Sequence, residues 1–291
     1  MKILLIGANG LIGTNLFYTL SKDNDFDLYA LVRSSTNFNN LFRTSDFKNL
    51  IELENYFDLQ KLKSLIKNLK PNTIINCCGI TKHNPNIKNK EEVIYINALF
   101  PHILARISSE QNAKLIHISS DCVFSGEKGF YDEKSNKDAI DFYGVTKSLG
   151  ELNEKNHLTL RTSTIGHELN TSYGLLNWFL NQKKCLGYRN AIFSGPTTLE
   201  LSKIIKNLVL SNNSLKGLLN ISAEPIDKFS LLGIIKNVYS LDTIIEPCSN
   251  IIVNRSLNPN KFLTSTNYSI KSWEQMILEM YLEKNSFLKN V

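Results

Sequence analysis

The chain has 291 residues, 42% of them hydrophobic, which suits one large α/β domain or a domain with a smaller lobe. Its net charge of +6 comes from 33 basic and 27 acidic residues, and the basic residues are mostly lysines scattered among asparagines. We therefore expect no nucleic-acid surface, whereas small phosphate-bearing molecules fit this charge. No apolar run is long enough for a membrane span, and five cysteines without a C-x-x-C pair indicate reduced thiols in the cytoplasm.

The first predicted element is a short apolar strand, Lys2–Ile6, which meets three glycines spaced three apart: Gly7, Gly10 and Gly13. A helical pattern follows at once. The free N–H groups and partial positive charge of a helix N-terminus bind phosphates, so this turn predicts a bound dinucleotide. Gly7 permits the turn, Gly10 lets the backbone approach the phosphates, and Gly13 lets the helix pack on the strand. The alternative is a glycine-rich turn without a ligand.

Strand and helix patterns alternate through the first 160 residues. Strands are expected at Lys2–Ile6, Leu28–Val32, Thr73–Cys77, Lys114–Ser119 and Leu158–Arg161. Helices are expected at Leu11–Leu20, Leu59–Leu69, Glu92–Ser109 and Tyr143–Glu154, with a kink at Pro101. This alternation predicts an α/β fold, a Rossmann-type parallel sheet wrapped by helices, with ligands outside the carboxyl ends of the strands.

Beyond about residue 163 the predicted strands become fewer and shorter. Helices are still expected at Tyr173–Gln182, Thr198–Leu210, Lys228–Tyr239 and Trp273–Leu282. This part predicts a smaller C-terminal lobe, with some segments returning to the sheet. We expect a dinucleotide-binding domain over residues 1–163, joined again by 190–222, and a substrate-binding lobe made of 164–189 and 223–291.

Tyr143 and Lys147 stand four residues apart on one face of a predicted helix. A lysine ammonium favours a neighbouring phenolate and lowers the pKa of the tyrosine from about 10. The tyrosine can then exchange a proton with an alcohol near neutral pH. Ser119 and Ser120, at the end of a predicted strand, offer a hydroxyl for the same oxygen.

A second pair, Tyr18 and Lys22, has the same spacing, and we interpret it as a packing tyrosine and a solvated lysine. The first pair differs in its surroundings, which include HISSDCVFSG (117–126), YDE (131–133) and YGVTKSLGE (143–151).

Together these motifs resemble the extended short-chain dehydrogenase/reductases, and most of all the dTDP-4-dehydrorhamnose reductases and related nucleotide-sugar reductases of polysaccharide synthesis. LRTSTIG (160–166), GLLNWFL (174–180) and AIFSGPTTLEL (191–201) also match this branch, so the resemblance covers roughly residues 1–222.

The resemblance implies roles for three residues. Tyr143 is the expected catalytic acid, Lys147 lowers its pKa and holds the nicotinamide ribose, and Ser120 positions the substrate oxygen. Asp121 and Cys122 are expected to line the substrate pocket. The family often has Thr in place of Ser120, Tyr in place of Cys122 and a proline shortly before the catalytic tyrosine, and these departures bear on which sugar is bound. Cys122 is either a reactive thiol or, as we favour, a small group that shapes the pocket.

The cofactor is expected to be NADP, with NAD as the alternative. Arg33 and Ser34 follow the second predicted strand, where an arginine accommodates the extra phosphate of NADP. The cofactor site is otherwise expected to comprise the loop residues Gly7, Asn9, Gly10, Leu11, Ile12 and Gly13, together with Asp58, Leu59, Cys78, Gly79, Thr81, Asn97, Tyr143 and Lys147.

Four residues expected at the cofactor or substrate site have structural alternatives. Arg33 either binds the NADP phosphate or is a surface arginine at a strand end. Asp58 either contacts the adenine with Leu59 or caps the following helix. Asn97 matches a family asparagine, or is only a buried, hydrogen-bonded amide. Arg161 either faces substrate phosphates or forms a structural ion pair. The five histidines show no metal-ligand spacing, so no metal is expected.

The expected function is therefore NADPH-dependent reduction of a keto-deoxy nucleotide sugar for a surface polysaccharide. One alternative is an epimerase or dehydratase on the same fold. Dehydratases of this family carry Asp-Glu after the catalytic Ser or Thr, whereas here Asp121 is followed by Cys122. The other alternative is a catalytically idle regulatory member. The expected partner is the nucleotide-sugar substrate, and we expect binding to neither nucleic acid nor a membrane. Whether the chain forms a homodimer is left open.

Overall fold

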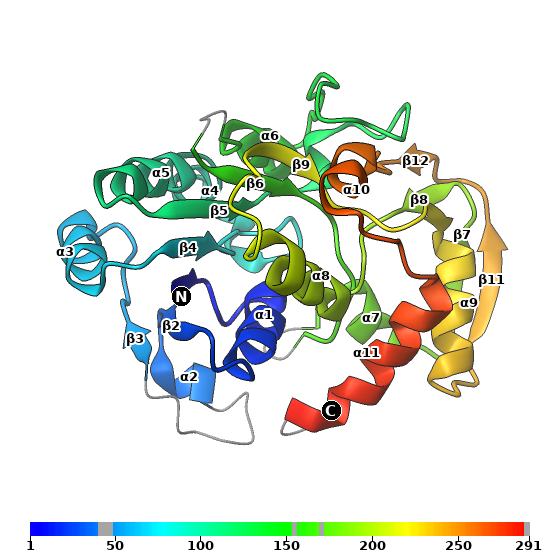
Figure 1. Ribbon diagram of the computed structural model, residues 1–291. Coiled ribbons are helices and arrows are strands. Elements are labelled where there is room, and N and C mark those ends of the chain that lie inside the picture. Colours follow the sequence, from blue (N-terminus) through cyan, green and yellow to red (C-terminus); the bar gives the residue numbers. More distant parts are fainter. Residues whose placement is uncertain (40–48, 153–155, 169–171, 288–291) are drawn as a thin grey trace.

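A computed structural model describes residues 1–39, 49–152, 156–168 and 172–287. Its centre is a parallel sheet of seven strands in the order β3-β2-β1-β4-β5-β6-β9 (Figure 1). In chain order these strands are β1 (Lys2–Ile6), β2 (Asp27–Val32), β3 (Leu50–Glu52), β4 (Thr73–Asn76), β5 (Lys114–Ile118), β6 (Leu158–Arg161) and β9 (Gly217–Asn220). The α/β, Rossmann-type prediction is confirmed.

Helices cover both faces of this sheet. The central strand β1 carries apolar side chains on both of its sides, and both sets must be buried. Ile3 and Leu5 point to one face, in a core shared with α1 (Leu11–Ser21) and α8 (Thr198–Ile204). Leu4 and Ile6 point to the other. That second face is covered by α3 (Leu59–Leu69), α4 (Lys90–Ile94) and α5 (Phe100–Glu110). A strand buried on both faces reads as a continuous apolar run, as this one does.

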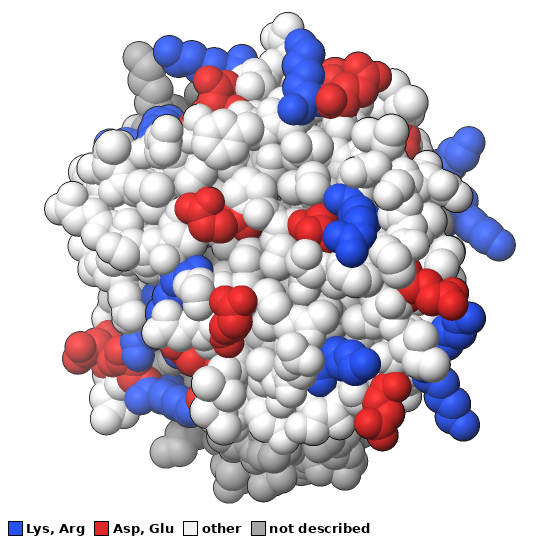
Figure 2. Space-filling model, turned by 90° about the vertical axis from the view of Figure 1, so that its right-hand side faces the viewer, with Lys and Arg blue, Asp and Glu red and all other residues white. Residues whose placement is uncertain are grey.

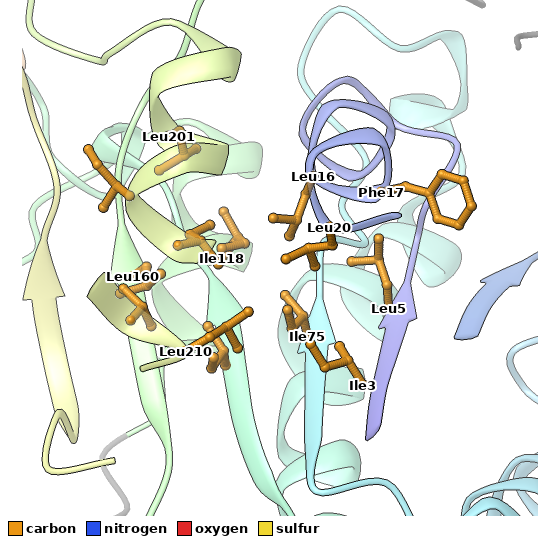
Figure 3. Packing of buried hydrophobic residues seen from close by; sticks show 14 of the residues in the cluster. Ile3, Leu5, Leu16, Phe17, Leu20, Ile75, Ile118, Leu160, Leu201 and Leu210 are labelled. Carbon is orange, nitrogen blue, oxygen red and sulfur yellow. The ribbon is translucent and has the colours of Figure 1, made fainter. Parts of the chain in front are cut away.

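Figure 3 shows how the first face is packed. Leu16 and Leu20 of α1 lie on Ile3 and Ile75 of the strands beneath. Leu201 of α8 lies in the same layer, above β5 and β6. Because α1 begins directly after the glycine turn, this packing fixes the position of the turn at the carboxyl edge of the sheet.

The long helix expected over Glu92–Ser109 is divided by a π-helical segment, η2 (Tyr95–Leu99), directly before Pro101. A proline lacks the N–H of a regular helix and its ring crowds the carbonyl four residues earlier, here that of Asn97. That carbonyl faces Gly150, where an added Cβ would lie 2.0 Å from the Asn97 oxygen. In place of the expected kink the helix has a π segment. Gly150, which follows α6 (Phe142–Leu149), packs on the Asn97 carbonyl of this segment.

A smaller lobe holds the rest of the chain. One sheet is β10-β8-β12, made of β8 (Ala191–Phe193), β10 (Ile226–Asp227) and β12 (Val253–Asn254), and β7 (Lys184–Tyr188) pairs with β11 (Ile244–Cys248). The helices are α7 (Leu175–Leu180), α9 (Lys228–Val238) and α11 (Trp273–Phe287). Helix α10 (Asn260–Thr266) instead packs on the main sheet, where Phe262 joins the core of α1 and α8. A separate apolar core joins α7, α9 and α11. The exact domain boundaries stay a prediction.

Some expected element boundaries were wrong. The helix expected at Tyr143–Glu154 ends at Leu149, before the close contact of Gly150 with Asn97. Three short elements were not predicted from the sequence, because they show no clear apolar period. These are β3, α10 and the five-residue helix α2 (Ser35–Asn39). A π segment, η4 (Ile205–Val209), continues α8 where one helix was expected.

The outer face of the smaller lobe carries both signs of charge. Figure 2 shows acidic and basic side chains interspersed across it. Lys184 and Glu246 form one such pair at 2.7 Å between β7 and β11. Within the described ranges, every helix is too short or too polar to span a bilayer.

Candidate active site

The glycine turn has the backbone geometry that a dinucleotide requires. Gly7 has φ +79°, a conformation that side chains disfavour. The Gly10 N–H closes the turn onto the Gly7 carbonyl at 3.2 Å. A Cβ on Gly13 would lie 2.1 Å from that same carbonyl oxygen, so only glycine allows α1 to pack this closely.

The N-terminus of α1 is open toward a ligand. Its N-cap is Gly10, which provides no capping side chain. The first N–H groups of a helix have no partner within the helix, and here they belong to Leu11, Ile12 and Gly13. An added Cβ on Gly10 would meet only the Gly7 oxygen, at 3.6 Å. The turn therefore fits a pyrophosphate, and these main-chain groups would hold it.

Beside this turn, the end of β2 provides an exposed cation. Arg33 follows β2, and its guanidinium lies 3.6 Å from the Glu92 carboxylate. The neighbouring Ser35 N–H donates to Glu52 at 2.8 Å. Arg33 is thus accessible at the carboxyl edge, in the place expected for the group that binds the NADP phosphate.

Asp58 caps α3, accepting a hydrogen bond from the Lys61 N–H at 3.1 Å, so the capping alternative is present in the structure. Asn97 is fully buried, and its amide holds both the N–H and the carbonyl of Ile80, at 2.8 and 2.9 Å. It therefore supports the loop after β4 from behind, as the buried-amide alternative describes.

The loop after β4 connects the glycine turn to the catalytic residues. Cys78 is buried behind Gly7, where an added Cβ would lie 2.9 Å from its sulfur. Burial raises the pKa of the Cys78 thiol to about 12. Gly79 and Thr81 are exposed, and an added Cβ on Gly79 would lie 4.0 Å from Lys147 Nζ. The glycine thus keeps the surface beside this ammonium open.

The three expected catalytic residues come together at the carboxyl end of β5. Ser120 follows β5, and its Oγ accepts the Cys122 N–H at 3.1 Å. Helix α6 carries Tyr143 and Lys147 and packs against Cys122 at Gly144, where a Cβ would lie 2.2 Å from the Cys122 oxygen. Lys147 Nζ donates to the Ile118 carbonyl at 2.8 Å.

The structure does not show the lowered pKa that was expected for Tyr143. Burial raises the pKa of Tyr143, and nearby Cys122 adds to this, whereas a hydrogen bond with Ser120 opposes it. Burial also lowers the pKa of Lys147 to about 8. The physical reason is desolvation, which disfavours the charged form of each group. Tyr143 is therefore a phenol at neutral pH.

Asp121 and Cys122 lie beside these residues and face a group of cations that sequence reasoning missed. Burial raises the pKa of Asp121, against the effects of the Cys122 hydrogen bond, Arg255 and Lys82. Lys228, in the first turn of α9, acts on the same two residues. We call Lys82, Lys228 and Arg255 the cation group. It joins three segments far apart in sequence, so no local motif marked it.

Arg161 does not face the site. Its guanidinium is 1% exposed and lies 2.8 Å from the Glu151 carboxylate, which is the ion-pair alternative. The second Tyr/Lys pair is also placed as expected: Lys22 lies over the Tyr18 ring at 3.8 Å and pairs with Glu283. Among the described residues, no three His, Cys, Asp or Glu side chains form a group that could hold a metal ion.

Comparisons with known proteins agree with this architecture. Methionine adenosyltransferase 2 subunit beta of Xenopus laevis is 29% identical over 150 residues, which are 52% of this chain and 41% of the relative. The dTDP-4-dehydrorhamnose reductase of Aggregatibacter actinomycetemcomitans is 25% identical, covering 77% of this chain and 74% of the relative. In the matches to three other curated relatives, among them the Xenopus laevis protein, the chain spans about half of the relative's length or less.

Solved structures show the same fold. The crystal structure of a hypothetical dTDP-4-dehydrorhamnose reductase from Sulfolobus tokodaii superposes with a TM-score of 0.76 at 23% identity, covering 94% of this chain and 98% of that one. The model of the family described as RmlD substrate binding domain matches residues 1–184, well over half of the chain. These matches confirm the resemblance seen in the motifs, and the chain belongs to the RmlD substrate-binding domain family.

Proposed function

We propose that the protein is a cytoplasmic NADPH-dependent reductase of a keto-deoxy nucleotide sugar, acting in the synthesis of a surface polysaccharide. The observation that carries this proposal is the meeting of Ser120, Tyr143 and Lys147 beside an open glycine turn. Relatives named dTDP-4-dehydrorhamnose reductase, from Aggregatibacter actinomycetemcomitans and Salmonella typhimurium, support the choice of substrate class.

The nicotinamide cofactor, when bound, supplies the hydride for a sugar carbonyl. Tyr143 is a phenol at neutral pH and is the group placed to protonate the oxygen. Burial raises its pKa and so weakens it as an acid, whereas its hydrogen bond with Ser120 acts in the opposite direction. Ser120 presents a hydroxyl to the same place and already interacts with Tyr143. The Lys147 ammonium, buried at the end of β5, stabilises the negative charge that develops on the oxygen.

The cation group supports a diphosphate-bearing substrate. Burial, followed by repulsion from Lys82, lowers the pKa of Lys228, so its charge is held there at an energetic cost. Arg255 is anchored by its Nε, which donates to the Phe124 carbonyl at 2.8 Å. An anion between these side chains would relieve the repulsion. A nucleotide sugar carries a diphosphate in the link between its sugar and its nucleoside.

Cys122 argues against the dehydratase alternative. Elimination needs an additional acid or base next to Asp121, where dehydratases of this family carry glutamate. Burial raises the pKa of the Cys122 thiol to about 12, and Asp121 contributes in the same direction. A thiol in that state neither gives nor takes a proton readily at neutral pH, and it fits the role of a small group that shapes the pocket.

A regulatory role is the second candidate, because three relatives are named as a subunit of methionine adenosyltransferase. The presence of all three catalytic side chains at one strand end favours the reductase. The two roles differ in one measurement, because only a reductase consumes reduced cofactor.

The test is the loss of NADPH absorbance on adding a 4-keto-6-deoxy nucleotide sugar. We expect one NADPH oxidised per product formed. Tyr143→Phe should lower turnover about 100-fold or more while NADPH still binds, since only the proton donor is removed. Tyr18→Phe, in the second Tyr/Lys pair, is the matched control and should change little.

Sugar turnover without net oxidation would instead assign the protein as an epimerase. Cofactor binding without turnover across dTDP- and UDP-sugars would favour the regulatory role. Equal turnover by Tyr143→Phe and Tyr18→Phe would contradict the choice of catalytic tyrosine.

A further inference from the structure

A buried ion pair lies beneath the catalytic residues. Glu151 lies two residues after the end of α6, and Arg161 ends β6. The Arg161 guanidinium donates twice to the Glu151 carboxylate, from Nε at 2.9 Å and from Nη2 at 2.8 Å. The two side chains are 1% and 2% exposed. A charge pair this deeply buried is costly to form, so its geometry must be well satisfied.

The remaining contacts of Arg161 are also with groups of the protein. Its guanidinium lies 4.8 Å from the centre of the Phe124 ring. Nη1 reaches the Asn220 side chain of β9 and the Asp132 carbonyl, both at 3.4 Å. Arg161 is therefore fully engaged by protein groups and has no side available to a substrate.

Glu151 reaches the catalytic serine through its neighbour. Ser119 Oγ donates to Glu151 Oε1 at 2.7 Å, and the Ser119 N–H donates to the Leu160 carbonyl at 2.8 Å. Ser119 is thus held both by the ion pair and by the adjacent strand. Because Ser120 is the next residue, these two bonds help to place its backbone at the end of β5. The hydroxyl itself donates to Asp121 Oδ1 at 3.3 Å and accepts the Cys122 N–H.

Glu151 and Lys147, four residues earlier, bind two adjacent residues. Lys147 Nζ donates to the Ile118 carbonyl at 2.8 Å, and Glu151 Oε1 accepts from Ser119 Oγ at 2.7 Å. The carboxylate therefore lies close enough to act on the ammonium. Burial lowers the pKa of Lys147 to about 8, and Glu151 is the strongest opposing influence. The other groups acting on Lys147 are Cys77 and Cys78 after β4 and His117 of β5. Burial raises the pKa of both thiols and lowers that of His117, so these three are uncharged at neutral pH. Of the four, Glu151 alone carries a charge, and its carboxylate also lies 3.4 Å from the Lys137 ammonium.

We propose that Glu151 is a positioning residue, which keeps the Lys147 ammonium charged and helps to place the backbone of Ser120, and that Arg161 serves the site by holding Glu151. The role in turnover rests on the proposed reductase function. The effect on Lys147 does not, because it concerns only the charge of one side chain in the protein itself.

The direct test follows the titration of Lys147 by NMR, in protein labelled with ¹³C at lysine Cε, with Lys147→Arg identifying the resonance. In Glu151→Gln the side chain keeps its size but loses its charge. We expect the titration midpoint of Lys147 to move from about 8 to a value lower by about one pH unit. Glu279→Gln, which removes a carboxylate that pairs with Lys203 and Lys271 elsewhere, is the control and should leave the midpoint unchanged.

Because Glu151→Gln leaves a buried arginine without its partner, the double variant Glu151→Gln/Arg161→Met is measured beside it. This variant contains neither charge, and the same downward shift is expected. In turnover, the loss of activity with rising pH should follow the Lys147 midpoint and therefore begin at lower pH in both variants. A purely structural role for Glu151 would lower turnover equally at every pH.

An unchanged Lys147 midpoint in both variants would overturn the proposal, even if the wild type reduces a nucleotide sugar. The failure of the reductase function looks different. In that case no sugar is reduced by the wild type, while the midpoint still shifts in the variants.

Discussion

Around the glycine turn the site consists of main chain, whereas around Asp121 it consists of long side chains from separate segments. Gly7, Gly10 and Gly13 lie within seven consecutive residues and offer N–H groups on a rigid strand–helix joint. Lys82, Lys228 and Arg255 come from the loop after β4, the start of α9 and the segment after β12. The main-chain part tolerates no added atom at Gly7 or Gly13, while the side-chain part can change its selectivity one residue at a time.

The largest effect should come from adding one methyl group to the main-chain part. Gly13→Ala places a Cβ 2.1 Å from the Gly7 oxygen, so the turn must open. We expect a loss of about 1–3 kcal/mol in the free energy of unfolding and a loss of NADPH affinity. Thermal unfolding and fluorescence titration with NADPH measure the two effects.

Gly233→Ala is the matched control. An added Cβ at Gly233, inside α9, meets nothing within 4 Å. Alanine in a helix interior should stabilise the protein by about 0.5–1 kcal/mol. If Gly13→Ala unfolds and binds NADPH as the wild type does, the turn is more adaptable than its geometry indicates.

A smaller and more selective effect is expected on the side-chain part. Lys228→Met should weaken the binding of dTDP and UDP about tenfold, the size of one charge-assisted hydrogen bond, and leave NADPH affinity unchanged. Isothermal titration with each ligand measures this. Lys236→Met, in the last turn of the same helix, removes an equal charge and should change neither affinity. If Lys228→Met weakened NADPH and the nucleoside diphosphates alike, the two parts of the site would not be separate.

The smallest effect concerns the choice between cofactors. The wild type should bind NADPH more tightly than NADH, and Arg33→Ala should remove most of that preference, about tenfold. Arg33 is exposed and forms an ion pair with Glu92. Salt screens exposed charges, so rising ionic strength should also reduce the preference for NADPH over NADH. Equal affinities for both cofactors in the wild type would rule out this role of Arg33.

The same contrast explains which parts of the site were predictable. The glycine spacing, the strand before it and the helix after it follow from local conformational rules, so the turn was placed at the right residues. Asn97, Asp58 and Arg161 had two interpretations each, because a sequence does not show what a side chain contacts. In the structure Asn97 is a buried amide, Asp58 caps a helix and Arg161 forms an ion pair. The cofactor contacts expected of Asn97 and Asp58 stay predictions.

The sequence by itself determined the parallel sheet, the glycine turn and the pairing of Tyr143 with Lys147, because each depends on periodicity or spacing over a few residues. Only the tertiary structure decided the charge states at the site. Burial raises the pKa of Tyr143 and lowers that of Lys147, against the expectation from their spacing. The cation group and the link from Glu151 through Ser119 to Ser120 were also decided there. Desolvation and long-range contacts depend on what the whole chain packs around a residue, and no local pattern contains that information.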